Sequence, residues 1–256
     1  MTIKLLQLNT NSDNYWDKLI PYLTSHEFDI LQLQELTGKG TISGNINSKR
    51  DTFTELRKIL QEKYNAELSL TQRYTSSPQA YMANGTFYKK QFSLIRIQEV
   101  VLSSFKPFPK DSTAYEHVGR RLLHLILAIN GKQISFLNTH FAWGGDHIEK
   151  HHQTKQGEIF LNYLQSVEPP FVLTGDFNLT PEQPLIQKIS AYTRNLIVEN
   201  GITNTLNPTN HRAKQLFPKG LAVDYLFTSK DLKAKKFQVV DENLSDHFGL
   251  GTEIII

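Results

Sequence analysis

Two short polar motifs lie beside apolar segments, and their side chains suit the chemistry of phosphate esters. Ser245–His247 (sequence SDH) precedes the apolar C-terminal run, and Thr174–Asn178 (sequence TGDFN) follows another apolar run. Two acids, an amide and an imidazole are groups that can hold a divalent cation, orient a water molecule and bind a phosphate. The combination predicts a hydrolytic phosphate site, which neither motif alone would establish.

Five polar side chains on predicted strands are in register with apolar neighbours. They are Asn9, Glu35, His140, Asp176 and Asp224. Because side chains alternate across a strand, each is expected to point to the same side as those neighbours, as Glu35 does with Leu31 and Leu33. All but Asp224 lie at the downstream ends of their strands, the edge where open α/β sheets gather ligands. A strand-terminal residue turned to solvent explains any one of them equally well and is favoured for Asn9 alone, but their agreement favours a functional site.

The apolar periodicity predicts an α/β chain that opens with a β-α-β unit. Strands are expected at residues 3–9, 28–35, 121–129, 133–138, 171–174, 222–228 and 248–256, and helices at 13–25, 51–63 and 146–166. Residues 67–102 are expected to form an antiparallel meander, broken at 76–78 and at 84–85. Asn130-Gly131 predicts the turn of the clearest hairpin.

Composition and length narrow the class of protein. The chain has 256 residues, of which 39% are hydrophobic, and we expect residues 1–256 to form a single domain. The net charge of +3 is compatible with a polyanionic substrate but does not establish one. The absence of cysteine excludes disulfides, thiolate zinc sites and cysteine nucleophiles. No apolar stretch approaches membrane-spanning length and the first residues do not resemble a secretory signal, so we expect a cytoplasmic monomer without a membrane span or a stable protein partner.

Six segments in order resemble motifs of the endonuclease/exonuclease/phosphatase superfamily, the metal-dependent phosphohydrolases that include deoxyribonuclease I and exonuclease III-like enzymes. The segments are Asn9, Leu33–Glu35 (LQE), Asn138–Phe141 (NTHF), Gly175–Asn178 (GDFN), Val223–Tyr225 (VDY) and Ser245–His247 (SDH). The resemblance covers nearly the whole chain. It implies a DNase I-like, four-layered α/β sandwich, in which two mixed β-sheets pack face to face with helices outside and the site lies at one edge.

The resemblance also implies a metal site and a histidine held by an acid. Glu35 would bind Mg²⁺ or Mn²⁺, with Asn9 and Asp246 at or near the ion, and hard oxygen ligands suit such cations. His247 would act as the general base or contact the phosphate, held in tautomer and orientation by Asp224.

Three further residues would act on the phosphoryl group according to the same resemblance. Asp176 would orient the attacking water or protonate the leaving oxygen, while Asn178 and His140 would donate to phosphoryl oxygens. In-line attack builds charge on these oxygens, which a cation and fixed donors stabilise, so no phosphoenzyme nucleophile is needed.

Several residues outside the six motifs allow both a functional and a structural interpretation. Arg120 and Arg121 suit a bidentate phosphate clamp, and a solvated strand start explains them equally well. His147 and His151 have the spacing of helical metal ligands, but an exposed helix is favoured, and His152 is expected at the surface. Loop residues that could contact nucleic acid are favoured as solvated side chains; they are Lys39, Lys49, Arg50, His211, Arg212, Lys214, Phe217 and Lys219. Lys39, Lys49 and Arg50 are near the predicted strand end at Glu35, and the other five belong to the irregular stretch 207–220. Long irregular stretches such as 104–119 and 207–220 are more often functional than idle in compact domains.

The expected activity is a divalent-metal-dependent nuclease reaction on DNA. His140 in its NTH context is more similar to the deoxyribonuclease I and phosphatase branches than to the abasic-endonuclease branch. Asp246–Leu250 resembles part of the SDHWGL ending of 5′-tyrosyl-DNA phosphodiesterases, so an enzyme of that type is included in the hypothesis.

Two alternatives remain open. A phosphatase or phospholipase C-type hydrolase of phosphoinositide or sphingomyelin head groups would need an exposed hydrophobic loop, and Ser104–Phe108 is the candidate. A catalytically inactive binding module of the same fold should have lost part of the predicted site, yet every acid and the histidine of the six motifs are present. The inactive module therefore ranks last.

Overall fold

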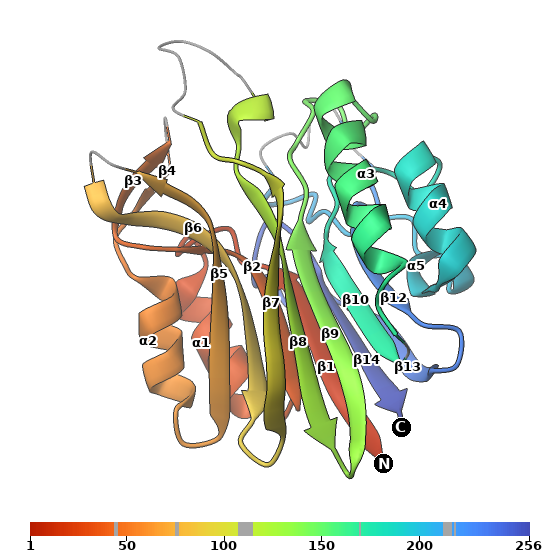
Figure 1. Cartoon of the computed structure of the whole chain (residues 1–256). Coiled ribbons are helices and arrows are strands. Elements are labelled where there is room, and N and C mark those ends of the chain that lie inside the picture. The colour runs from red at the N-terminus through yellow and green to blue at the C-terminus, as the bar shows by residue number, and fades with distance from the viewer. Residues whose placement is uncertain (44–45, 75–76, 107–114, 169, 212–216, 218) are drawn as a thin grey trace.

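Two six-stranded β-sheets pack face to face, with helices on the outer faces of the sandwich (Figure 1). The computed structural model describes residues 1–43, 46–74, 77–106, 115–168, 170–211, 217 and 219–256. In spatial order, the first sheet contains β13 (Lys233–Val240), β14 (Gly249–Ile255), β1 (Thr2–Asn9), β2 (Ile30–Thr37), β6 (Ser77–Lys89) and β5 (Tyr64–Tyr74). The second contains β11 (Arg194–Asn195), β12 (Asp224–Thr228), β10 (Phe171–Asp176), β9 (Lys132–His140), β8 (Arg120–Ile129) and β7 (Ser93–Ser103). A small sheet pairs β3 (Gly40–Ser43) with β4 (Ile46–Ser48).

Each sheet is mixed, as the sequence predicts. The parallel pairs are β1 with β2 and β9 with β10, and the other pairs are antiparallel. The helices α1 (Trp16–Ser25) and α2 (Thr52–Leu60) cover the first sheet, and α3 (His151–Leu164) and α4 (Pro184–Tyr192) cover the second (Figure 1). The predicted four-layered sandwich is therefore confirmed. No helix among the described residues is long and apolar enough to cross a bilayer.

The interior divides into two apolar clusters because both faces of each sheet are covered. On β1, Ile3 and Leu5 belong to the cluster between the sheets, whereas Leu6 and Leu8 pack in the cluster under α1 and α2. A strand buried on both faces reads as a continuous apolar run, which explains why the predicted strand at 3–9 lacks a polar face.

The predicted β-α-β unit and the predicted hairpin turn are both present in the structure. β1, α1 and β2 form the predicted β-α-β unit with parallel strands, although α1 begins at Trp16 rather than at residue 13. Asn130 and Gly131 both have positive φ, 51° and 77°, which suits the two-residue turn between β8 and β9.

Two predicted boundaries were wrong. Asn84-Gly85 does not break the meander but lies inside β6, where Gly85 leaves room for Leu36: a Cβ on Gly85 would lie 2.5 Å from Leu36 Cδ1. The helix expected from residue 146 begins only at His151. Short or half-exposed elements gave no usable pattern and were not predicted; they include α4, α5 (Leu196–Glu199), β3, β4, β11 and β13.

Candidate active site

Four of the five predicted polar strand residues end strands at the same edge of the sandwich. Asn9 ends β1, His140 ends β9 and Asp176 ends β10, while Glu35 lies near the end of β2. The fifth, Asp224, begins β12 and pairs directly with Asp176, because β12 runs antiparallel to β10. Parallel pairing within each sheet and face-to-face packing of the sheets therefore gather distant segments at one place.

Glu35 reaches this place through a β-bulge, not through regular alternation. Leu31 and Leu33 face the helices α1 and α2, so a regular strand would turn Glu35 toward those helices. The pairing of β2 with β6 shifts between Leu33 and Leu36, and Glu35 has a φ of 56°. The expectation that Glu35 shares a face with Leu31 and Leu33 was wrong, since the bulge re-aims its carboxylate to 3.9 Å from His140 Nε2.

A buried imidazole lies between two buried carboxylates. His247 Nδ1 is 2.8 Å from Asp224 Oδ2, and His247 Nε2 is 3.8 Å from Asp176 Oδ2. Burial lowers the pKa of His247, but the charges of Asp224 and Asp176 outweigh it and raise that pKa well above its usual value. Burial and the neighbouring Asp224 raise the pKa of Asp176 to about 7. The cluster can therefore hold or exchange a proton near neutral pH.

Two asparagines fix the carboxylate of Asp176. The Asn9 side chain donates to Asp176 Oδ2 at 2.9 Å, and the Asn178 backbone N–H donates to Asp176 Oδ1 at 2.8 Å. The Asn178 side-chain nitrogen also lies 3.2 Å from His140 Nε2. Burial, with the charges of Arg120 and His247, lowers the pKa of His140 well below its usual value, so this ring is neutral.

The donor set near Glu35 fits a hard divalent cation. Burial, followed by the charge of Asp246, raises the pKa of Glu35, so a second carboxylate opposes the ionisation of Glu35. Asp246, His247 and His211 also place ligand atoms within 4.8 Å of one another. A divalent cation would relieve this repulsion, and carboxylate oxygens are suitable ligands for it. His211 belongs to a segment that the sequence favoured as solvated, and only its position 5.8 Å from the His247 ring reveals this proximity.

Beneath the site, three buried amides connect the two sheets. Gln7 donates to Gln34 Oε1 at 2.8 Å and to Asp224 Oδ1 at 3.2 Å, and Gln34 donates to Asn138 Oδ1 at 2.7 Å. Asn138 in turn donates to the carbonyl oxygens of Leu33 and Gly85. Sequence reasoning missed Gln7 and Gln34 as positioning residues, although each is a polar residue inside an apolar strand.

The neighbouring residues Arg120 and Arg121, both predicted to bind phosphate, have different surroundings. Arg120 is buried, and its charge acts on both Glu35 and His140, which places its guanidinium beside the site. Arg121 is bonded to Glu99 at 2.6 Å instead, so the structure does not bring it to the site. Strand alternation sends the two neighbouring arginines to opposite faces.

The histidines at 147 and 151 do not form a helical pair. His147 precedes α3, is only 2% exposed and has a φ of 60°, whereas His151 is exposed at the start of the helix. The expectation of an exposed helix was therefore wrong for His147. His152 is half-buried, with its Nε2 3.3 Å from the Trp143 carbonyl oxygen.

The loop residues expected near nucleic acid are only partly described. Arg50 pairs with Glu55 at 3.1 Å, and Lys39, Lys49 and Lys219 are exposed. Residues Arg212 and Lys214, and Pro107-Phe108 of the candidate hydrophobic loop, lie outside the described residues.

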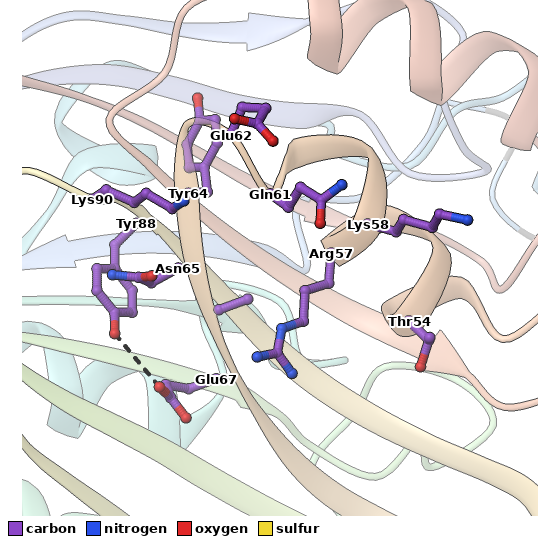
Figure 2. A pocket seen from close by; sticks show the side chains of 11 residues that line it. Thr54, Arg57, Lys58, Gln61, Glu62, Tyr64, Asn65, Glu67, Tyr88 and Lys90 are labelled. Atoms are coloured by element: carbon purple, nitrogen blue, oxygen red, sulfur yellow. Dashed lines mark hydrogen bonds between the residues drawn. The ribbon is translucent and has the colours of Figure 1, made fainter.

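A wide groove on another part of the surface contains none of the predicted site residues. It has a volume of about 660 Å³ and lies between α2 and the strands β5 and β6 (Figure 2). Its walls carry Arg57, Lys58 and Lys90, and Tyr88 donates to Glu67 at 3.5 Å. The converging titratable groups are at the strand ends and not in this groove.

Comparison with known proteins agrees with this geometry. Residues 6–247 match the model of the Endonuclease/Exonuclease/phosphatase family. The chain belongs to this family. A comparison with curated protein sequences finds no match.

Solved structures share the fold at low sequence identity. An endonuclease/exonuclease/phosphatase from Bacteroides vulgatus has a TM-score of 0.73 at 17% identity, covering 100% of this chain and 99% of that one. A mannosyl-6-phosphatase from Bacteroides thetaiotaomicron has a TM-score of 0.68 at 15% identity, with 99% and 100% covered. A humanized D. rerio TDP2 has a TM-score of 0.71 at 15% identity, with 100% and 99% covered. The family establishes phosphoester hydrolysis as the general activity, and divalent metal ions are general in it.

The amide layer beneath the site generates a stability prediction. We expect Asn138→Ala to lower the free energy of unfolding by about 3 kcal/mol, because it removes the buried side chain that accepts from Gln34 and donates to two backbone carbonyl oxygens. Urea unfolding measures this change. Asn200→Ala, which removes the part-buried hydrogen bond from the exposed Asn200 to the Leu196 carbonyl oxygen, is the matched control. Equal losses in the two variants would show that the layer does not hold the sheets together.

Proposed function

We propose that the protein is a divalent-metal-dependent phosphodiesterase that hydrolyses DNA by in-line attack of water. The observation that carries this proposal is the contact chain Asp224–His247–Asp176, with distances of 2.8 and 3.8 Å, beside the carboxylate of Glu35. Segments separated by more than half of the chain supply these groups. Burying these ionisable side chains lowers the free energy of unfolding, and such clusters of buried ionisable groups are typical of functional sites.

The electrostatics support a division of roles between His247 and Asp176. With its pKa raised by two carboxylates, His247 is a cation that can contact a phosphoryl oxygen. Asp176, whose pKa is about 7, can accept a proton from the attacking water, and Asn9 and Asn178 fix its orientation. Asp224 holds the His247 ring through Nδ1.

The remaining residues bind and orient the substrate in this proposal. Asn178, His140 and Arg120 would contact phosphoryl oxygens, which the contact of Asn178 with His140 and the charge of Arg120 on His140 support. Arg121 is omitted because of its pairing with Glu99. Glu35, Asp246 and Asn9 would hold Mg²⁺ or Mn²⁺, which supplies neutralisation of charge on the phosphoryl oxygens.

Phosphomonoester hydrolysis is the second candidate, because the structural neighbours include a mannosyl-6-phosphatase as well as TDP2. Hydrolysis of lipid head groups has less support, because its candidate loop is described only as far as Lys106. The inactive module has no support, because it should have lost at least one of five residues that are all present: Glu35, Asp176, Asp224, Asp246 and His247.

Substitution of the two central groups tests the proposed site. We expect Glu35→Gln and His247→Ala each to lower kcat/KM on a DNA substrate by about a thousandfold, because a metal ligand and a positioned imidazole act on the transition state. Glu99→Gln on β7 is the matched control and should retain wild-type activity. Melting temperatures verify folding. Turnover within about tenfold of wild type in either site variant would show that its assigned role is wrong.

Metal removal and a substrate panel test the proposed activity. The panel contains plasmid and single-stranded DNA, abasic duplex, 5′-tyrosyl oligonucleotide, RNA, inositol phosphates, sphingomyelin and mannose 6-phosphate. We expect cleavage of DNA with Mg²⁺ or Mn²⁺, its loss with EDTA, and recovery when excess metal is added. Hydrolysis of monoesters alone would replace the nuclease proposal with the phosphatase, and EDTA-resistant cleavage would refute metal dependence.

A further inference from the structure

A row of aromatic rings lies next to the candidate active site. The ring centroids of Tyr115 and Trp143 are 5.2 Å apart, those of Trp143 and His147 are 6.1 Å apart, and those of His147 and Phe217 are 5.0 Å apart. The residues come from three separate segments of the chain. We call Trp143, His147 and Phe217 the aromatic row.

His147 is held in an unusual state within this row. It is only 2% exposed and has a left-handed backbone conformation, with a φ of 60°, which few residues other than glycine adopt. Its Nδ1 is 3.2 Å from the Asn178 carbonyl oxygen, which can only accept, so Nδ1 carries the proton. Burial lowers the pKa of His147 to about 4, so the ring is neutral. The other nitrogen, Nε2, is therefore an acceptor.

Two buried polar atoms of the row have no hydrogen-bond partner among the described residues. They are His147 Nε2, an acceptor, and Trp143 Nε1, a donor. An unpaired buried polar group costs free energy, and such groups in folded proteins call for an explanation. Backbone strain at the same residue is a second cost, and strained residues cluster at functional sites. Both costs would be offset if a substrate group paired with these atoms.

The row is connected to the reacting groups through Asn178. Its backbone carbonyl holds His147, and its side-chain nitrogen lies 3.2 Å from His140 Nε2. The charge of His247 also acts on His147. A phosphate bound at His247 would thus have its ester group within reach of the row.

We propose that the aromatic row is a nucleobase subsite, in which His147 Nε2 accepts from the base and Trp143 Nε1–H donates to it. The subsite rests on the proposed phosphodiesterase activity and specifies the part of the substrate next to the phosphate. A nucleobase has aromatic faces that stack and an edge that presents donors and acceptors together. A hexose fits less well, because its many hydroxyls need more polar partners than the two that the row offers.

Access to the two buried atoms requires one neighbouring side chain to move. Phe217 contacts His147 edge-on and is partly exposed. In this proposal it is the side chain that shifts when a base enters. The base would then replace the Phe217 ring against His147 and keep the aromatic contact.

A pair of esters that differ only in the base tests this subsite. One is thymidine 5′-(4-nitrophenyl phosphate), and the other is the same ester with hydrogen in place of thymine. Release of nitrophenol with Mn²⁺ gives kcat/KM for both. We expect the wild type to prefer the thymidine ester, and His147→Phe and Trp143→Phe to lower the ratio of the two kcat/KM values by about tenfold, since each removes one buried hydrogen bond. His151→Phe, at the exposed start of α3, is the matched control and should keep the wild-type ratio.

The outcomes separate the subsite from the proposed activity. Equal kcat/KM for the two esters in the wild type, or a loss that is the same for both esters in the variants, would overturn the subsite while the hydrolase remains. Hydrolysis of neither ester by the wild type would overturn both proposals. Trp143→Phe keeps the ring packing, so it gives the ratio even if His147→Phe does not fold, and His147→Asn provides a further variant that tolerates the left-handed backbone.

Discussion

The structure depends on the mutual compensation of ionisable groups buried between two sheets. His247 is held at 2.8 Å by Asp224 and approaches Asp176 at 3.8 Å, so that one positive charge lies among several carboxylates. Removing a single partner would leave an uncompensated buried charge, which is far costlier than an exposed one. The compensation remains incomplete at Glu35 and Asp246, and this residual repulsion is the physical reason for assigning the cation there.

Three features of the fold produce this arrangement. Parallel strand pairs bring chain ends to one edge, the amide layer of Gln7, Gln34 and Asn138 fixes the sheets relative to each other, and the bulge at Glu35 re-aims a single carboxylate. The aromatic row adds a feature that the phosphate chemistry does not require. Its His147 combines a left-handed backbone with an unpaired buried ring nitrogen, and the proposed base would pair with that nitrogen.

The sequence was sufficient to predict the architecture and to name the candidate site residues, but not to predict the direction in which their side chains point. Apolar runs located β1, β9 and β10, and Asn130-Gly131 located a hairpin, because these signals are local. The bulge at Glu35 depends on the pairing of β2 with β6, which no local pattern reveals. His147 was placed on a helix because its segment has helical periodicity, whereas its ring contacts the Asn178 carbonyl oxygen and its own carbonyl oxygen accepts from the Thr180 N–H, both distant in sequence. Likewise, Arg120 and Arg121 differ only in the face that each occupies.

The central claim is that Glu35 and His247 act on one phosphate beside one bound cation. A crystal structure with Mn²⁺ and a thymidine phosphorothioate ester, using anomalous scattering to locate the metal, tests it most directly. The account predicts Mn²⁺ ligated by Glu35, with the phosphorothioate between the ion and His247. Manganese bound elsewhere, such as in the groove between α2 and β5, or a phosphorothioate out of reach of His247, would contradict it.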